Sequence, residues 1–160
     1  MLLLPDYQLH DGSALDRANL VKFLQRSYQE LFPAQNYAHL ALTVDNYFCK
    51  NTPLWWVEFV GDEGEKRQKN SPWVACLWLG NALDQVYGDR HAHIFLIYVV
   101  PEHRRRGVAT ALMLHAENWA KARGDRQIGL QVFQINQPAL NLYHHLGYQP
   151  HSLWMAKTLE

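Results

Sequence analysis

The chain has 160 residues, 48% of them hydrophobic, and its 15 Lys and Arg residues balance its 15 Asp and Glu residues. This length suits a single domain over residues 1–160, and the apolar content excludes a disordered chain. The zero net charge argues against a general binder of nucleic acid or of anionic membranes. Cys49 and Cys76 form no CxxC pair, and no stretch approaches the roughly 18 apolar residues of a membrane span, so we expect a cytoplasmic protein.

The first third of the chain favours one short strand followed by two helices. Residues 6–12 have the composition of a strand, and residues 15–32 have apolar positions at helical spacing. Pro33 closes that helix, and residues 37–48 repeat the helical pattern more weakly. We expect the two helices to form a pair that precedes the main sheet.

Two strands and two turns follow. Residues 54–60 and 73–79 are predicted strands, and the charged, glycine-bearing segment 61–70 between them is typical of a hairpin loop. Residues 81–90 contain a Gly-Asp pair and predict a second turn.

Residues 93–124 form the stretch on which the rest of the chain depends. Residues 93–100 are dominated by apolar, β-branched and aromatic side chains, which indicates a strand buried on both faces, and Pro101 ends it. Three arginines and Gly107 then lead into a helix that ends near Gly124. The first N–H groups of a helix have no intrahelical partner and carry positive potential, so this turn predicts a phosphate site.

The last predicted elements are a strand, a helix and a strand. The first strand covers residues 127–133, the helix runs from Asn136 to Gly147, and a closing strand covers residues 153–159. The element order predicts an α+β fold with α/β/α layers.

Two segments of this chain resemble one family. Arg104 to Ala109, RRRGVA, resembles the (Q/R)xxGx(G/A) acetyl-CoA signature of the GNAT superfamily of N-acetyltransferases. Asn136 and the segment LYHHLGY at 142–148 are similar to that family's N…ALxLYxxxGF segment. The resemblance implies a mixed, mostly antiparallel central sheet with a splayed strand pair and flanking helices. It also implies acetyl-CoA as co-substrate. His91 and His93 have no third ligand at recognisable spacing, so we expect no metal site.

The same resemblance implies which residues bind acetyl-CoA. Backbone groups of 97–99 would pair with the pantetheine arm, and N–H groups of 105–110 would hold the phosphates, with Gly107 permitting their close approach. The implied set is Ile97, Tyr98, Val99, Arg104, Arg105, Arg106, Gly107, Val108, Ala109, Thr110, Asn136 and Tyr143. For the three arginine side chains, contact with the pyrophosphate or the 3′-phosphate and a role as solvated surface charge both remain open.

The resemblance also implies catalytic roles. A backbone N–H near Val99 would stabilise the oxyanion, and Tyr143 matches the tyrosine that protonates the departing thiolate. Tyr143 also fits a core position on the inner face of its helix, and the two roles are compatible.

The general base is less evident. Ribosomal-protein acetyltransferases have a glutamate where this chain has Gln131, and glutamine cannot take a proton at neutral pH. His93 matches the position of the base in histone acetyltransferases, and the arylalkylamine acetyltransferases have a His-x-His pair two residues away from His91 and His93. Both histidines also fit ordinary positions near the start of a strand. Lesser candidates are Asp84 and Glu58, and an enzyme that binds neutral amines needs no base.

These features predict acetyl transfer to a primary amine, on a small molecule or a peptide N-terminus, by direct attack in a ternary complex. The alternative is a non-catalytic acyl-CoA-binding regulatory module, which the glutamine at position 131 favours. A nucleotide-hydrolysing protein is disfavoured because no GxxxxGK[ST] segment is present. The sequence leaves the acceptor and a homodimer open. The aromatic residues of the early helices fit either an amine pocket or the core.

Overall fold

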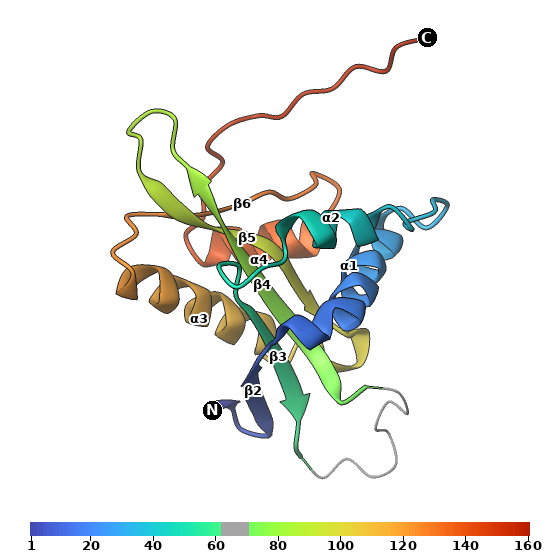
Figure 1. Ribbon diagram of the computed structural model, residues 1–160, viewed down its shortest axis with the longest axis vertical. Helices are drawn as coiled ribbons and strands as arrows, with labels where there is room; N and C mark the ends of the chain where they lie inside the picture. Colours follow the sequence, from blue (N-terminus) through green and yellow to red (C-terminus); the bar gives the residue numbers. More distant parts are fainter. Residues whose placement is uncertain (62–70) are drawn as a thin grey trace.

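The computed structural model describes residues 1–61 and 71–160 (Figure 1), so nearly all of the predicted loop over 61–70 lies outside the described residues. The strands of the described part are β1 Leu2–Leu4, β2 Tyr7–Asp11, β3 Leu54–Phe59, β4 Trp73–Leu83, β5 Arg90–Val99 and β6 Ile128–Leu130. Its helices are α1 Arg17–Leu31, α2 Leu40–Tyr47, α3 Val108–Ala122 and α4 Gln137–His145, with short 3₁₀ turns at Ala14–Asp16 and Pro101–His103. No helix in the described ranges is long and apolar enough to cross a membrane.

The strands form one sheet in the order β1-β2-β3-β4-β5-β6. Neighbours from β1 to β5 are antiparallel, and β6 lies parallel to β5 after the crossover through α3. The pairing of β5 with β6 extends only from Ala92 and Ile128 to Ile94 and Leu130, while β5 continues to Val99. The two strands therefore separate, and the prediction of an α+β fold with a splayed strand pair is confirmed.

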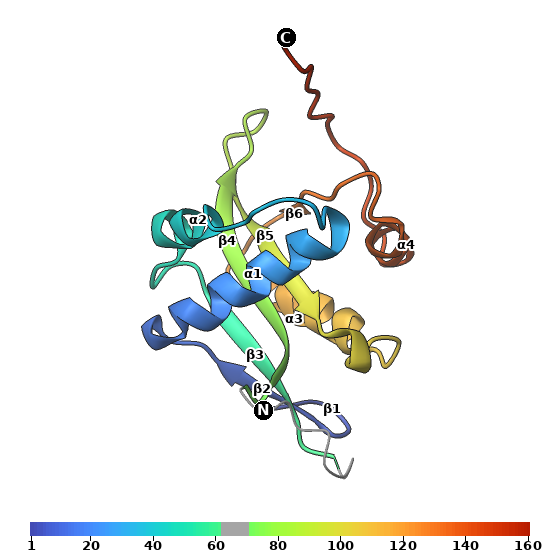
Figure 2. The same ribbon diagram turned by 90° about the vertical axis from the view of Figure 1, so that its right-hand side faces the viewer.

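Helices cover both faces of the sheet, as the two views of the ribbon show (Figures 1 and 2). Trp55 and Trp56 are neighbours on β3 and point to opposite faces. The Trp55 ring lies 4.7 Å from that of His115 on α3, and the Trp56 ring lies 5.1 Å from that of Phe23 on α1. The alternation along β3 therefore fixes α3 on one face and the α1–α2 pair on the other.

Several strand limits differ from the predictions. The strand β1 was not predicted, because three leucines are too short to show a period; it pairs with β2 through a turn in which Asp6 has φ 68°. The expected turn over 81–90 is shorter, since β4 runs to Leu83 and β5 begins at Arg90. The Asp84 Oδ1 atom accepts a hydrogen bond from the Val86 N–H at 2.8 Å, which stabilises the turn at the tip of the β4–β5 hairpin.

The expected burial of residues 93–100 on both faces is confirmed in part, because Ile94 and Tyr98, on opposite faces, are buried, whereas His93, Phe95 and Ile97 are half-buried. Side chains of β5 alternate between buried and half-buried, from half-buried His91 and buried Ala92 to half-buried Ile97 and buried Tyr98.

The predicted closing strand over 153–159 is wrong. This segment forms no strand, and all of its residues are exposed. The strand expected over 127–133 is likewise reduced to β6, because the chain leaves β5 after Leu130. Apolar residues at a period of two indicate that a segment can form a strand, but a strand also needs the edge of a neighbouring strand to pair with. The chain after α4 leads away from its own sheet (Figure 1).

Packing of α3 against the sheet should dominate the stability of this fold. Leu112 is fully buried, and Leu114 on the same helix is 50% exposed. Leu112→Ala should lower the free energy of unfolding by about 2–5 kcal/mol, because it removes buried methyl groups and leaves a cavity. Urea unfolding measures the change, with Leu114→Ala as the matched control. Equal losses in the two variants would contradict this account of the core.

Candidate active site

A bulge in β5 decides which face of the sheet the histidines occupy. Trp78 on β4 lies opposite Leu96, but Leu79 lies opposite Ile94, so Phe95 is an extra residue in β5. Strict alternation would place His93 on the same face as Ile97, whereas the bulge places it on the face of Tyr98. The Tyr98 ring lies 5.6 Å from that of Phe23, so this is the face that α1 covers.

Phe95 packs closely at the bulge. Its ring lies 5.7 Å from that of Tyr47 on α2 and 5.8 Å from that of His93. A Cβ at Gly80, which is opposite His93, would lie 2.1 Å from two atoms of the Phe95 ring. Only glycine at this position leaves room for the ring, so Gly80 permits the arrangement that holds His93.

His93 is half-buried and lies beside His91 and β6. The two imidazole rings are 6.5 Å apart, and a Cβ at Gly129 would lie 3.5 Å from His93 Nδ1. Burial, followed by the neighbouring His91, lowers the pKa of His93 below its ordinary value of 6.5. The ring is therefore neutral at pH 7 and able to accept a proton.

The other predicted base candidates occupy different surroundings. Gln131 is exposed, one residue beyond the end of β6. Asp84 caps the β4–β5 tip, where the N–H of Val86 is the main cause that holds the pKa of its carboxyl below the usual range. The Glu58 carboxylate lies 3.0 Å from His10 Nε2, on β3. The structure brings none of the three onto β5 or β6.

The turn before α3 presents backbone N–H groups that could bind an anion. Arg105 has φ 62° and Gly107 has φ 84°, both in the left-handed region, which is costly for arginine. Gly107 is the N-cap of α3 and offers no capping side chain, and Ala111 N–H donates to the Gly107 carbonyl at 3.0 Å. The N–H groups of residues 108–110 precede that bond and so have no acceptor within the helix.

The three predicted arginines differ in their contacts. Arg104 donates two hydrogen bonds to the Glu30 carboxylate, at 2.8 and 2.9 Å, and its Nε donates to the Val99 carbonyl at 2.8 Å. The Arg106 guanidinium lies 6.0 Å from the centre of the Phe59 ring, and Arg105 is exposed. The Arg104 side chain is thus held by contacts within the protein itself.

Glu30 is a residue that the sequence did not single out. It lies on α1 and accepts the Tyr98 hydroxyl at 2.5 Å as well as the two bonds from Arg104. Burial and, second, this hydrogen bond to Glu30 raise the pKa of Tyr98. Glu30 is 68 positions away from Tyr98 in the sequence and 74 positions away from Arg104. No local sequence pattern therefore predicts these contacts. Glu30 ties α1 to both β5 and the turn.

Helix α4 positions the predicted tyrosine. The Asn136 side chain caps α4 by accepting the Ala139 N–H at 3.4 Å, which gives Asn136 a structural role. Tyr143 is buried, its ring lies 6.0 Å from that of Tyr148, and burial raises its pKa above 10. The Tyr143 phenol therefore stays protonated at neutral pH and can donate a proton.

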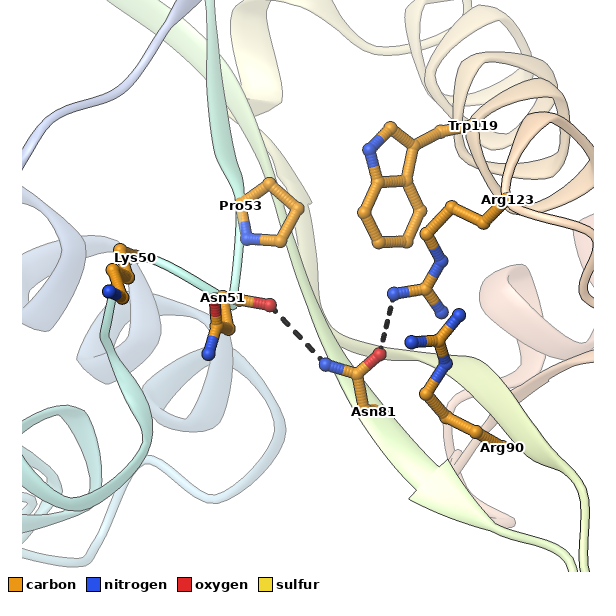
Figure 3. A pocket seen from close by; sticks show the side chains of 7 residues that line it. All are labelled: Lys50, Asn51, Pro53, Asn81, Arg90, Trp119 and Arg123. Carbon is orange, nitrogen blue, oxygen red and sulfur yellow. Dashed lines mark hydrogen bonds between the residues drawn. The ribbon is translucent and has the colours of Figure 1, made fainter.

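An open pocket of about 500 Å³ lies at the other end of α3 (Figure 3). Arg123 stacks over the Trp119 ring at 4.0 Å, donates to Asn81 at 2.7 Å and pairs with Asp125. These contacts fix the turn that leads from α3 into β6. Because Trp119 and Arg123 are at the C-terminal end of α3, this pocket is separate from the turn of residues 104–107.

Neither metal-binding clusters nor disulfides were found in the described part of the chain. No three His, Cys, Asp or Glu side chains group there in a way that would hold a metal ion. Cys49 is exposed and Cys76 is buried, both are free, and burial raises the pKa of the Cys76 thiol.

Comparison with known proteins gives related sequences and structures. Over 52 residues the chain is 38% identical to streptothricin acetyltransferase of Streptomyces lavendulae, a match that covers 32% of this chain and 28% of that protein. The chain thus spans less than a third of the length of this curated relative.

Two solved structures share the fold over nearly their full length. An acetyl transferase from Pyrococcus furiosus has a TM-score of 0.65 and 26% identity, with 96% of this chain and 99% of that chain covered. An acetyltransferase from Clostridium acetobutylicum, solved with acetyl-CoA, has a TM-score of 0.71 and 18% identity, with 95% and 96% covered. The model of the Acetyltransferase (GNAT) family matches residues 18–148. This match includes the splayed strands, the turn before α3 and Tyr143, and the chain belongs to the GNAT family of acetyltransferases.

Proposed function

We propose that this protein transfers an acetyl group from acetyl-CoA to a primary amine, by direct attack of the amine in a ternary complex. The observation that carries the proposal is the separation of β5 from β6 beside an uncapped helix N-terminus. This arrangement leaves backbone groups available in a line from β5 to the start of α3. The family membership of the chain and the relative solved with acetyl-CoA support the same donor.

The donor would be held mainly by the backbone. The edge of β5 over 97–99 faces the gap left by β6 and would pair with the pantetheine arm. The N–H groups of residues 105–110 would bind the pyrophosphate, where the dipole of α3 adds positive potential. A Cβ at Gly107 would come no closer than 3.8 Å to Leu4, so φ rather than space requires glycine there.

The chemistry requires one proton to leave and one to arrive. The amine nitrogen bonds to the thioester carbon, the C–S bond breaks, and the amine loses a proton while the thiolate gains one. His93, neutral at pH 7 because of its lowered pKa, would take the amine proton directly or through one water. Tyr143 would give a proton to the thiolate, and a backbone N–H near Val99 would stabilise the oxyanion.

The acceptor would approach from the face covered by α1 and α2, because His93 is on that face. The Phe133 ring lies 5.1 Å from that of Phe32 and 5.8 Å from that of Tyr28, and Phe133 is 44% exposed. Exposed aromatic faces attract ammonium groups. A small amine or a peptide N-terminus would fit beside these aromatic rings, and the relative from Streptomyces lavendulae is by its name an acetyltransferase of streptothricin.

Turnover distinguishes the enzyme from a non-catalytic acyl-CoA-binding module. Thiol release from acetyl-CoA should rise above the buffer rate when one of a panel of aminoglycosides, polyamines and peptides is added. Calorimetry with CoA provides the independent binding measurement. Tight binding of CoA without thiol release for any amine would favour the regulatory module, and an absence of binding would overturn both readings.

Tyr143→Phe tests the general acid. Loss of the hydroxyl should lower kcat by about 10²-fold and leave the Kd for CoA nearly unchanged, because the ring still packs. Tyr148→Phe is the matched control, since the Tyr148 hydroxyl is buried without a hydrogen-bond partner among the described residues. A kcat unchanged in Tyr143→Phe would remove this residue from the acid role.

The pH dependence tests His93. Its neutral form is the active one, so kcat/KM should fall as the pH decreases through the pKa of His93, which lies below 6.5. His93→Ala should remove this acidic limb and lower kcat/KM at pH 7 by about 10²-fold. His91→Gln should instead move the limb to higher pH, because His91 helps to lower the pKa of His93. If the unmodified protein, His93→Ala and His91→Gln all showed the same acidic limb of kcat/KM, His93 would be excluded as the base.

A further inference from the structure

Basic side chains gather in the pocket at the C-terminal end of α3, which has no part in the proposed acetyl transfer. The pocket has a volume of about 500 Å³. Of the seven residues that line it, Lys50, Arg90 and Arg123 are basic and the other four are uncharged (Figure 3). A concave surface lined by one sign of charge attracts ions of the opposite sign.

The positive charges lie on two opposite walls of this pocket. Lys50 belongs to the loop between α2 and β3, whereas Arg90 is the first residue of β5 and Arg123 is the C-cap of α3. Figure 3 shows Lys50 across the pocket from the two arginines, which both pair with Asp125 and so lie close together. A ligand that spans the pocket would therefore meet positive charge at both ends.

Hydrogen bonds within the protein fix both walls. The buried Thr52 hydroxyl accepts the Cys49 N–H at 2.8 Å and donates to the Tyr47 carbonyl at 2.8 Å. These bonds fix the loop that carries Lys50. On the other wall, the N–H groups of residues 123–125 donate to carbonyls in the last turn of α3, which reduces the repulsion of an anion by that helix end. The pocket is thus formed before any ligand binds, which lowers the entropy lost on binding.

The three basic side chains differ in how far the protein already uses them. The Arg123 side chain is 20% exposed, donates to Asn81 at 2.7 Å and pairs with Asp125. The Arg90 side chain is 58% exposed and lies 3.6 Å from the Asp125 carboxylate, which is too long for a hydrogen bond. Lys50 is also exposed. Arg90 and Lys50 therefore keep N–H donors for a ligand, and Arg123 adds its charge.

The Asp125 carboxylate connects this pocket with β5. Its side chain is 2% exposed, and it accepts the Ala92 N–H at 2.8 Å in addition to its contacts with the two arginines. Ala92 lies between His91 and His93 and is opposite Ile128 at the start of β6. The arginines of the pocket thus hold the carboxylate that fixes the backbone beside the proposed base.

We propose that this pocket binds a small organic molecule with two anionic groups, one beside Lys50 and the other beside Arg90 and Arg123. The volume is in the range of small-molecule sites, and two separated anionic groups match the charge on both walls. Carboxylates and phosphates share the chemistry that arginine and lysine recognise. The ligand binds only while the arginines keep their places, so it also stabilises the Asp125 contact with Ala92. The site binds its ligand whether or not the protein transfers acetyl groups.

Calorimetry on the full chain measures the binding directly, with citrate as the carboxylate probe and fructose 1,6-bisphosphate as the phosphate probe. Saturating CoA is present, so that the turn before α3 is not available to the probes. At least one probe should bind with a Kd below about 1 mM at roughly physiological ionic strength, and the tighter one identifies the anionic group. Inorganic phosphate should bind at least about 10-fold more weakly, because one ion cannot reach both walls. An absence of saturable binding for both probes, or inorganic phosphate that binds as tightly, would overturn the proposal.

Removal of single charges tests the two walls. Lys50→Gln and Arg90→Gln should each raise the Kd of the bound probe by about 10-fold, because each removes a hydrogen-bond donor that carries a charge. Arg126→Gln is the matched control, because Arg126 is 81% exposed, pairs with Asp89 at 3.5 Å and does not line this pocket. Equal losses of affinity in all three variants would indicate general attraction to a basic surface and would overturn the proposal.

Hydrogen exchange on the unmodified chain locates the bound probe without any substitution. With CoA present, the probe should slow exchange at Ala92 and at residues 123–125, because local opening there releases the ligand. The amides of residues 105–110 should not respond to the probe. Slowing confined to 105–110 would place the anion at the turn before α3 and overturn the proposal. Unchanged exchange at Ala92 would contradict the connection through Asp125.

Discussion

The separation of β5 from β6 is the constraint on which the site depends. Backbone pairing between β5 and β6 stops at Ile94 and Leu130, yet β5 continues for five residues to Val99. Unpaired backbone groups are costly when they are buried without a partner, so an edge of this kind calls for a ligand, water or another chain. A CoA arm would satisfy the β5 side of the gap.

The bulge at Phe95 is a second constraint, because it links packing to chemistry. One extra residue in β5 exchanges the faces of all side chains before it, and so carries His93 from the α3 face to the α1 face. Gly80 makes the bulge possible by leaving room for the Phe95 ring. The same packing half-buries His93, and this burial, together with His91, lowers the pKa of His93 below its ordinary value of 6.5.

Glu30 joins the two halves of the proposed site. Its carboxylate holds Arg104, whose Nε also binds the Val99 carbonyl, and it accepts the Tyr98 hydroxyl. Both partners of the ion pair are about 40% exposed, at 38% for Glu30 and 42% for Arg104, so its contribution to stability is of the order of 1 kcal/mol or less. The ion pair acts mainly by fixing positions. It connects α1, on the proposed acceptor side, with the turn before α3, on the proposed donor side.

The sequence by itself determined the features that neighbouring residues define. The uncapped turn at Gly107, the start of α3, the cap of α4 at Asn136 and the family resemblance all depend on short segments, whose backbone preferences are local. Only the tertiary structure decided the face that His93 occupies, the role of Glu30, the short length of β6 and the exposure of residues 153–159. The reason is physical: a strand pattern fixes neither its register nor its neighbour, and contacts between residues dozens of positions apart form only when the sheet is assembled.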